Sequence, residues 1–229
     1  METTDTKIKK FIFTVPLQVT LGKAWYKSEE SEILKNELLS AFPIIIAMNA
    51  YAKKGDKIKL IPVVTEDEGG VAKKNFATFE QELDSLRQAK GFACEFEQEI
   101  DGAKLDLHIF TPEKETIKNH LALYANLISR IGDNEIIYAD ITYGQRPVSM
   151  IMQMSLNYAY KLRKGTDIGA IVYGAIPPGQ HNKDPKNGFV YDVSPLFFMD
   201  AISSTMAHLK FDDPAKKIKG LLAIDMDME

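Results

Sequence analysis

The sequence has one cysteine, no apolar run of membrane-spanning length and no excess of positive charge. Cys94 has no second cysteine in the chain with which to form a disulfide, which favours a reducing compartment, so we expect a cytoplasmic protein. The longest apolar stretch, 38–52, contains Pro43 and is shorter than the roughly 20 residues of a membrane-spanning helix, so no membrane association is expected. The formal net charge of -4 argues against binding to duplex nucleic acid, which depends on a basic surface.

Several motifs of catalysis and cofactor binding are also missing. No G-x-G-x-x-G string follows a predicted strand, and there is neither a Walker lysine loop nor a serine or cysteine in a nucleophile elbow. The four histidines fall in different predicted elements and lack the spacing of a metal site. We therefore expect no cofactor and no bound metal, and we do not expect nicotinamide, flavin or ordinary nucleotide-hydrolysing chemistry.

Short apolar runs alternate with longer segments of helical period, a pattern typical of an α/β domain with a mostly parallel central sheet flanked by helices. The expected strands are 11–19, 57–65, 135–141 and 168–176, followed by an edge strand at 189–193. The expected helices are 31–54, 75–90, 113–131, 147–164 and 194 to about 210. Residues 93–110 predict a small β-hairpin insertion that turns at Asp101-Gly102. We assign one domain to residues 1–210 and leave the tail, 211–229, unassigned.

Ligands of open α/β sheets bind outside the carboxyl ends of the strands, so polar residues just after a strand are candidates for a site. One such segment, 138–147, runs from a buried strand into a helix. Gly144 allows close backbone approach, Pro147 suits the first helical turn, and the amides that begin a helix attract anions. Arg146 adds a planar set of donors for a phosphate. The segment thus has the parts of an anion site.

Two neighbours of Gly144 extend this interpretation, because Thr142 offers a hydroxyl and Tyr143 offers a flat ring on which a base could stack. The alternative is purely structural: Asp140 and Thr142 cap a helix, and Arg146 pairs with a surface carboxylate. A further group, Met150, Met152 and Met154, predicts packing in the core or at a dimer interface.

The string Asp140-Ile-Thr-Tyr-Gly-Gln-Arg-Pro147 resembles the D-I-T-x-G-x-R motif of the CRISPR-associated Rossmann fold (CARF) family. Downstream, Tyr173-Gly174 is similar to the tyrosine-glycine pair that ends a strand in that family, and 190–195 is similar to its closing element. The resemblance covers mainly 136–199. The sequence departs from the family at Tyr143, where histidine or glycine is common, and at Gln145, where a phenylalanine-like residue is common.

The resemblance implies a Rossmann-like domain that forms a homodimer and binds a cyclic oligoadenylate, a tetra- or hexa-adenylate, in one symmetric pocket. Such a protein is a sensor in type III CRISPR antiviral signalling. Carried over to this chain, the floor of the pocket would consist of Thr142, Tyr143, Gly144, Gln145 and Arg146. Its wall would consist of Thr14, Val15, Pro16, Leu17 and Gln18. The other candidate contacts are Asn49, Tyr173 and Gly174.

Three interpretations of the whole chain remain open. The family usually joins the sensor to an effector domain, so the chain could be the sensor part of a longer protein, a free-standing ligand sink or adaptor, or a metal-independent ring nuclease. In the last case Thr14 or Thr142 would orient the attacking ribose 2'-hydroxyl, and Arg146 would stabilise the developing phosphorane charge. The competing hypotheses are a Rossmann-like enzyme or binding domain for an unrelated phosphorylated small molecule, and an interaction module without a ligand.

Overall fold

The computed structural model describes residues 7–97, 99–100, 103–104, 109–112, 115–180, 185–207 and 213–222. The chain divides into two compact units, Met1–Val193 and Ser194–Glu229. The second unit holds two helices, α5 (Ser194–Ala207) and α6 (Pro214–Leu222). The helix expected to begin at residue 194 is therefore present, and α6 lies in the tail that the sequence left unassigned.

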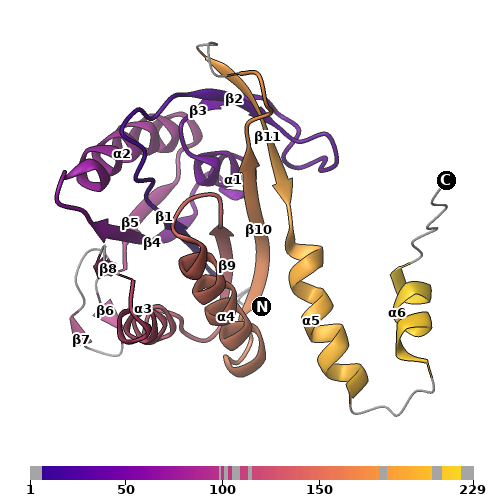
Figure 1. The fold of residues 1–229 in the computed structure, drawn as a ribbon. Coiled ribbons are helices and arrows are strands. Elements are labelled where there is room, and N and C mark those ends of the chain that lie inside the picture. Colours follow the sequence, from indigo (N-terminus) through magenta and orange to yellow (C-terminus); the bar gives the residue numbers. More distant parts are fainter. Residues whose placement is uncertain are drawn as a thin grey trace, which may run out of the picture. The chain divides into compact units, whose positions relative to one another are not determined.

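The first unit is built on a nine-stranded mixed sheet (Figure 1). Its strands are β1 (Ile8–Thr14), β2 (Ala24–Lys27), β3 (Leu38–Ser40), β4 (Lys57–Glu66), β5 (Ala93–Phe96), β8 (Ile109–Pro112), β9 (Glu135–Asp140), β10 (Asp167–Ala175) and β11 (Lys186–Asp192). They follow the order β3-β2-β11-β10-β9-β1-β4-β5, with β8 also paired to β4. The strands from β5 to β10 in this order are parallel, and β11 is antiparallel to β10. The predicted Rossmann-like α/β fold is confirmed.

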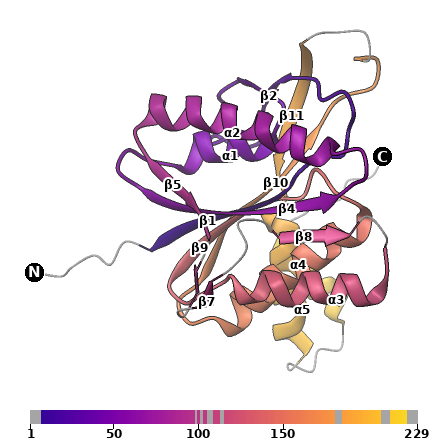
Figure 2. The same ribbon diagram turned by 90° about the vertical axis from the view of Figure 1, so that its left-hand side faces the viewer.

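Helices cover both faces of this sheet (Figure 2). The helices α1 (Pro43–Tyr51) and α2 (Val71–Lys90) lie on one face, and α3 (Ile117–Ser129) and α4 (Arg146–Leu162) lie on the other. Towards α2, the ring of Phe13 packs against Phe79 with centroids 4.4 Å apart. Towards α1, Phe11 stacks on Tyr138, which also contacts Tyr51. On the α3 and α4 side, the buried residues include Leu127 and Leu156. Both faces are thus shielded, as a mostly parallel sheet requires.

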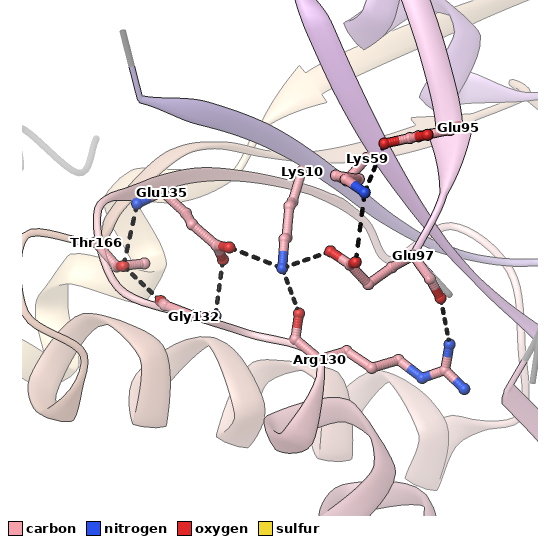
Figure 3. A network of polar contacts seen from close by, with 8 residues as sticks. All are labelled: Lys10, Lys59, Glu95, Glu97, Arg130, Gly132, Glu135 and Thr166. Carbon is pink, nitrogen blue, oxygen red and sulfur yellow. Dashed lines mark hydrogen bonds and ion pairs between the residues drawn. The ribbon is translucent and has the colours of Figure 1, made fainter. Parts of the chain in front are cut away.

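A buried ionic network at the amino ends of the strands explains where β1 begins (Figure 3). Lys10 is 2 % exposed, and its Nζ lies 2.8 Å from a carboxylate oxygen of Glu97 and 2.8 Å from one of Glu135. The same Nζ donates to the Arg130 carbonyl at 2.6 Å. The strand was predicted to start at residue 11 because lysine is rarely buried, but these partners allow β1 to start at Ile8.

The predicted helix 31–54 is wrong in its first half. The backbone amides of residues 31 and 34 donate to the hydroxyls of Ser28 and Ser31, which form turns, and β3 follows. The helix α1 begins only at Pro43, in the position where proline is preset for a first helical turn.

The segment after β5 does not form the single hairpin that was predicted for residues 93–110. A short antiparallel pair, β6 (Glu99–Ile100) and β7 (Ala103–Lys104), agrees with a hairpin, and its expected turn at Asp101-Gly102 lies outside the described residues. The flanking strands β5 and β8 do not pair with each other, because each pairs in parallel with a different part of β4. The insertion therefore interrupts a strand at the margin of the sheet.

Two other predicted boundaries are wrong. Residue Pro112 ends β8 and does not open a helix; α3 starts at Ile117 after Thr116, whose hydroxyl accepts the amide of Asn119 at 3.1 Å. The strand β11 is not at an edge, because β2 pairs with it on the side away from β10. The β2–β3 extension was not predicted.

Within the described part of the chain, no helix combines the length and apolar character needed to cross a bilayer.

Candidate functional site

The carboxyl ends of β1, β9 and β10 bring most of the predicted site residues to one edge of the sheet. In the pairing register, Asp140 of β9 lies opposite both Phe13 of β1 and Val172 of β10. The segments that follow these positions are therefore neighbours, although they are far apart in sequence. Thr14 contacts the turn at Gly144, and Thr142 contacts Gly174, as described below.

The turn at Gly144 packs directly on the end of β1. Gly144 has a φ of +104°, and a Cβ at this position would lie 2.9 Å from Cγ2 of Thr14. Both the positive φ and the close approach of Thr14 therefore favour glycine at position 144. Beneath this turn, the Thr14 side chain is buried, and its Oγ1 has no hydrogen-bond partner among the described residues.

Asp140 holds the turn and α1 together. Its Oδ1 accepts the backbone amide of Thr142 at 2.8 Å, and its Oδ2 accepts the amide of Ile44 at 2.9 Å. The carboxylate thus caps the amino end of α1, which has no cap from its own N-cap residue. Burial raises the pKa of Asp140 to about 6, and the hydrogen bonds from Thr142 and Ile44 offset only part of that effect.

The hydroxyl of Thr142 is committed to the fold. Its Oγ1 accepts the amide of Gly174 at 2.7 Å, and the same side chain hydrogen-bonds to Asp140. Gly174 is needed here because a Cβ would lie 2.3 Å from Cγ of Pro43. Thr142 and Gly174 therefore position the turn against β10 and α1. With one bond donated and one accepted, the Thr142 hydroxyl keeps a single lone pair for a ligand, and its expected role in orienting an attacking group stays a prediction.

Tyr143 points into the protein. Its hydroxyl donates to the carbonyl of Ala41 at 2.8 Å and also interacts with Tyr26, and burial raises its pKa. The residue anchors the turn to the corner between β3 and α1. It is not the stacking surface that the sequence suggested, because its ring packs against the core.

The amino end of α4 differs from those of the other helices in the first unit. A carboxylate caps α1, as described, and Asp67 accepts the amides of Val71 and Ala72 at the start of α2. The start of α3 is capped by a threonine hydroxyl. At α4, Gln145 is the N-cap residue, but its side chain makes no capping bond, and the first turn holds no acidic residue. In this first turn Pro147 has no amide hydrogen, and the amide of Val148 donates to the Gln145 carbonyl at 2.9 Å, so the amide of Arg146 is the first one available to an anion.

Arg146 lies at this same helix end. Its side chain is exposed and makes no ion pair with any described residue. The structural alternative, in which it pairs with a surface carboxylate, is thus not what the described residues show. The guanidinium on the first residue of α4 adds to the positive potential of the helix amino end, in a protein whose net charge is -4.

The loop after β1 contributes less surface than expected. Val15 and Pro16 are buried, Leu17 is half-buried, and only Gln18 is exposed. Asn75 of α2 fixes this loop, because its Nδ2 donates to the carbonyls of Pro16 at 2.8 Å and Gln18 at 3.0 Å. The role of Asn75 was not predicted, since nothing local in the sequence links it to a loop 57 residues away.

An aromatic row lies beside the turn, at the ends of β10 and β11. Tyr173 is 41 % exposed and lies opposite Tyr191 in the antiparallel pairing. Phe189 shares the face of Tyr191, with ring centroids 6.4 Å apart. Tyr173 was predicted as a contact, whereas Tyr191 and Phe189 were missed because their side chains can be placed only once the register of β11 is known.

Asn49 does not belong to this group. It lies in the last turn of α1, about 9 Å along the helix axis from Pro43. Its carbonyl accepts a hydrogen bond from Lys90, and the nearby Tyr51 carbonyl accepts one from Lys9 of β1. These partners place Asn49 towards the amino ends of the strands, so the structure does not bring it together with the other predicted residues, and its role in ligand binding stays a prediction.

The described residues contain no group of three or more histidine, cysteine, aspartate or glutamate side chains arranged to hold a metal ion. Comparison of the chain with protein-family models found no match, and comparison with curated proteins found none either.

Proposed function

We propose that the first unit binds a cyclic oligoadenylate and acts as a sensor of this second messenger in type III CRISPR antiviral signalling, as one half of a homodimer. The observation that carries the proposal is the start of α4 at the carboxyl edge of the sheet, where the amide of Arg146 has no side-chain cap and its exposed guanidinium has no ion-pair partner among the described residues. A phosphate placed there would gain hydrogen bonds from the helix end and from the guanidinium.

The surroundings of this helix end favour a nucleotide over a bare anion. Tyr173, Tyr191 and Phe189 form an aromatic row on the neighbouring strands, and aromatic side chains bind bases by stacking. The turn itself is braced by Asp140, through its bonds to Thr142 and Ile44. A braced turn binds with little loss of conformational entropy.

Ring cleavage has weaker support than binding. In that reaction the ribose 2'-oxygen would attack the adjacent phosphorus, the bond to the 5'-oxygen would break, and the proton of the 2'-hydroxyl would be lost while the leaving 5'-oxygen gained one. The Thr14 hydroxyl is buried, and the Thr142 hydroxyl is already bonded. Only Arg146 and the helix amides remain to act on the phosphate, so the proposal is a sensor and not a nuclease.

Thermal unfolding with a panel of ligands tests the proposal. Cyclic tetra-adenylate or hexa-adenylate should raise the melting temperature strongly, whereas AMP, ATP and inorganic phosphate should raise it little. A larger shift with a mononucleotide would point to a different phosphorylated ligand. No shift with any of these compounds would favour an interaction module, and either result would overturn the proposal.

Replacing Arg146 with alanine tests the phosphate contact itself. We expect Arg146→Ala to weaken binding of the cyclic oligoadenylate by about 10- to 150-fold, the range for a lost hydrogen bond to a charged group. Lys164→Ala is the matched control, because it removes the same charge just beyond the other end of α4, where the side chain is also exposed. Equal effects of the two substitutions on the dissociation constant would show a general charge effect and contradict a contact at Arg146.

A further inference from the structure

A groove lies between α2 and the margin of the sheet at β3. Its volume of about 530 Å³ is within the range of small-molecule sites. One wall consists of β3 and the residue before β2, and we call the space the α2–β3 groove. The other wall is a stripe of six residues along α2: Thr78, Gln81, Glu82, Ser85, Leu86 and Ala89.

The two ends of this groove differ in character. The stripe on α2 is about 16 Å long, and it begins with the polar residue Thr78 and ends with the apolar pair Leu86 and Ala89. On the facing wall, β3 contributes Leu38. A ligand that fits this shape has a polar head near Glu82 and an apolar group of up to about 10 Å, the length of helix from Glu82 to Ala89.

Glu82 is a buried carboxylate in the wall of the groove. Its side chain is 9 % exposed, and the Ser40 hydroxyl at 2.6 Å and the Ala41 amide at 3.3 Å hold it in place. Among the described residues its one ion pair is with Lys23, whose Nζ lies 3.1 Å away on a side chain that is 48 % exposed. The fold therefore fixes the carboxylate, whereas its cation is half in water and another cation could replace it.

The hydroxyls on either side of Glu82 accept hydrogen bonds from the groove. Thr78 is four residues before Glu82 and Ser85 is three residues after it, so both lie next to it on the helix. The Thr78 hydroxyl donates to the carbonyl of residue 74 at 3.2 Å, and the Ser85 hydroxyl donates to the carbonyl of residue 81 at 3.0 Å. Because each hydroxyl hydrogen is used within the helix, both oxygens present lone pairs to the groove. Three acceptors in a row suit a head group with several N–H donors.

The charge of this part of α2 also favours a cation. Between residues 78 and 89 the helix has three acidic residues, Glu80, Glu82 and Asp84, against one basic residue, Arg87. The Arg87 Nε lies 3.0 Å from a carboxylate oxygen of Asp84. Lys23 is the one basic residue that lines the groove. It does not balance both remaining carboxylates, so the local potential attracts positive ligands.

We propose that the α2–β3 groove is a second ligand site of the first unit and binds an organic ammonium ion, a primary amine that carries an apolar group. The ammonium donates to Glu82 in place of Lys23, and the apolar group lies between Leu38 and Leu86. The proposal goes beyond the binding of cyclic oligoadenylate and does not rest on it, because the groove shares no residue with the start of α4.

Calorimetric titration of the full chain with three probes tests the ligand class. Octylamine should bind with a dissociation constant of about 1 mM or tighter, because several methylene groups leave water. Octanoate has a similar chain with the opposite charge, and methylamine has the charge without the chain. Both should bind at least about tenfold more weakly than octylamine. Octanoate binding as tightly as octylamine, methylamine binding as tightly, or no binding of octylamine would each overturn the proposal.

Replacing Lys23 tests which charge of the ion pair holds the head group. Lys23→Ala should tighten octylamine binding by about 1.5- to 5-fold, because it removes the cation that competes for Glu82. The residue is half exposed, so the substitution leaves the core intact. Weaker binding of octylamine to this variant would overturn the placement of the ammonium at Glu82.

A tethered ammonium provides an independent measurement. Ser85→Lys places a lysine one helical turn after Glu82, where it should occupy the site and weaken octylamine binding at least about tenfold. Gln88→Lys is the matched control, because it adds the same charge at an exposed position of α2 that does not line the groove. Both substituted residues are exposed, and thermal unfolding checks that each variant is folded. Equal losses of octylamine binding in the two variants would show a general charge effect and overturn the site.

Discussion

At the scale of single residues, Asp140 connects three parts of the site. Its carboxylate receives one amide from the turn and one from α1, and it has almost no contact with water. The structure therefore gives a structural role to the first residue of the D-I-T-x-G-x-R string. It also places an acid of unusual pKa next to the proposed phosphate site.

The pKa of Asp140 predicts how stability depends on pH. Because burial raises this pKa from 3.8 to about 6, the native state holds a proton that the unfolded chain has lost between these values. The contribution of Asp140 to stability is therefore greatest below pH 3.8 and falls as the pH rises through 6, by about 3 kcal/mol in total. Urea unfolding of Asp140→Asn and the unmodified chain between pH 4 and pH 7 measures this. If the two curves of unfolding free energy against pH run parallel, the prediction is wrong.

The sequence predicted the position of the site better than the roles of its side chains. The strand, the glycine turn and the helix at 138–147 are local features, so pattern alone identified them. The partner of the Thr142 hydroxyl is 32 residues away, and that of the Tyr143 hydroxyl is 102 residues away. Which of these side chains turn inwards depends on tertiary contacts that no local pattern contains.

At the scale of elements, the strands β4, β9 and β10 and the helix α4 were predicted well. β4, β9, β10 and α4 lie within about two residues of their expected bounds. Two of the failures occur where a polar residue is buried with partners or an apolar residue is exposed. The start of β1 was predicted too late because the buried Lys10 lies inside the strand. The helix was predicted to start too early because Ile33, which is 55 % exposed, fits the apolar spacing of a helix.

The network around Lys10 gives a prediction for β1. Lys10→Met should lower the free energy of unfolding by about 3 to 5 kcal/mol, because it leaves the carboxylates of Glu97 and Glu135 buried without their common cation. The control is Lys7→Met, which removes the partially exposed ion pair with Asp167 and should cost about 1 kcal/mol or less. Denaturant unfolding of both variants measures the difference. Similar losses for the two would show that the buried network does not stabilise the start of the strand.

At the scale of the whole molecule, pairing and ligand binding should be linked. In the proposed homodimer, a pocket shared by both copies would bring two copies of Arg146 and two positive helix ends together, and their mutual repulsion opposes the dimer until an anion lies between them. Cyclic oligoadenylate should therefore tighten the dimer by at least about fivefold, a usual lower value for coupling between sites.

Sedimentation velocity over a range of protein concentrations measures this linkage. Without ligand, Arg146→Ala should dimerise at least as tightly as the unmodified chain, because the repulsion between the two guanidinium groups is gone. With ligand, the variant should lose most of the tightening. A ligand that dissociates the unmodified dimer, or a variant that dimerises more weakly without ligand, would contradict the linkage.

The strands at the two margins of the sheet are short, and this affects the tendency of the protein to aggregate at high concentration. On one side, β3 has three residues, and on the other β5 has four residues before the β6–β7 insertion intervenes. Neither margin offers a run of unmatched amides and carbonyls long enough to template a foreign strand. Growth of a fibril by addition of strands to either margin is thereby disfavoured.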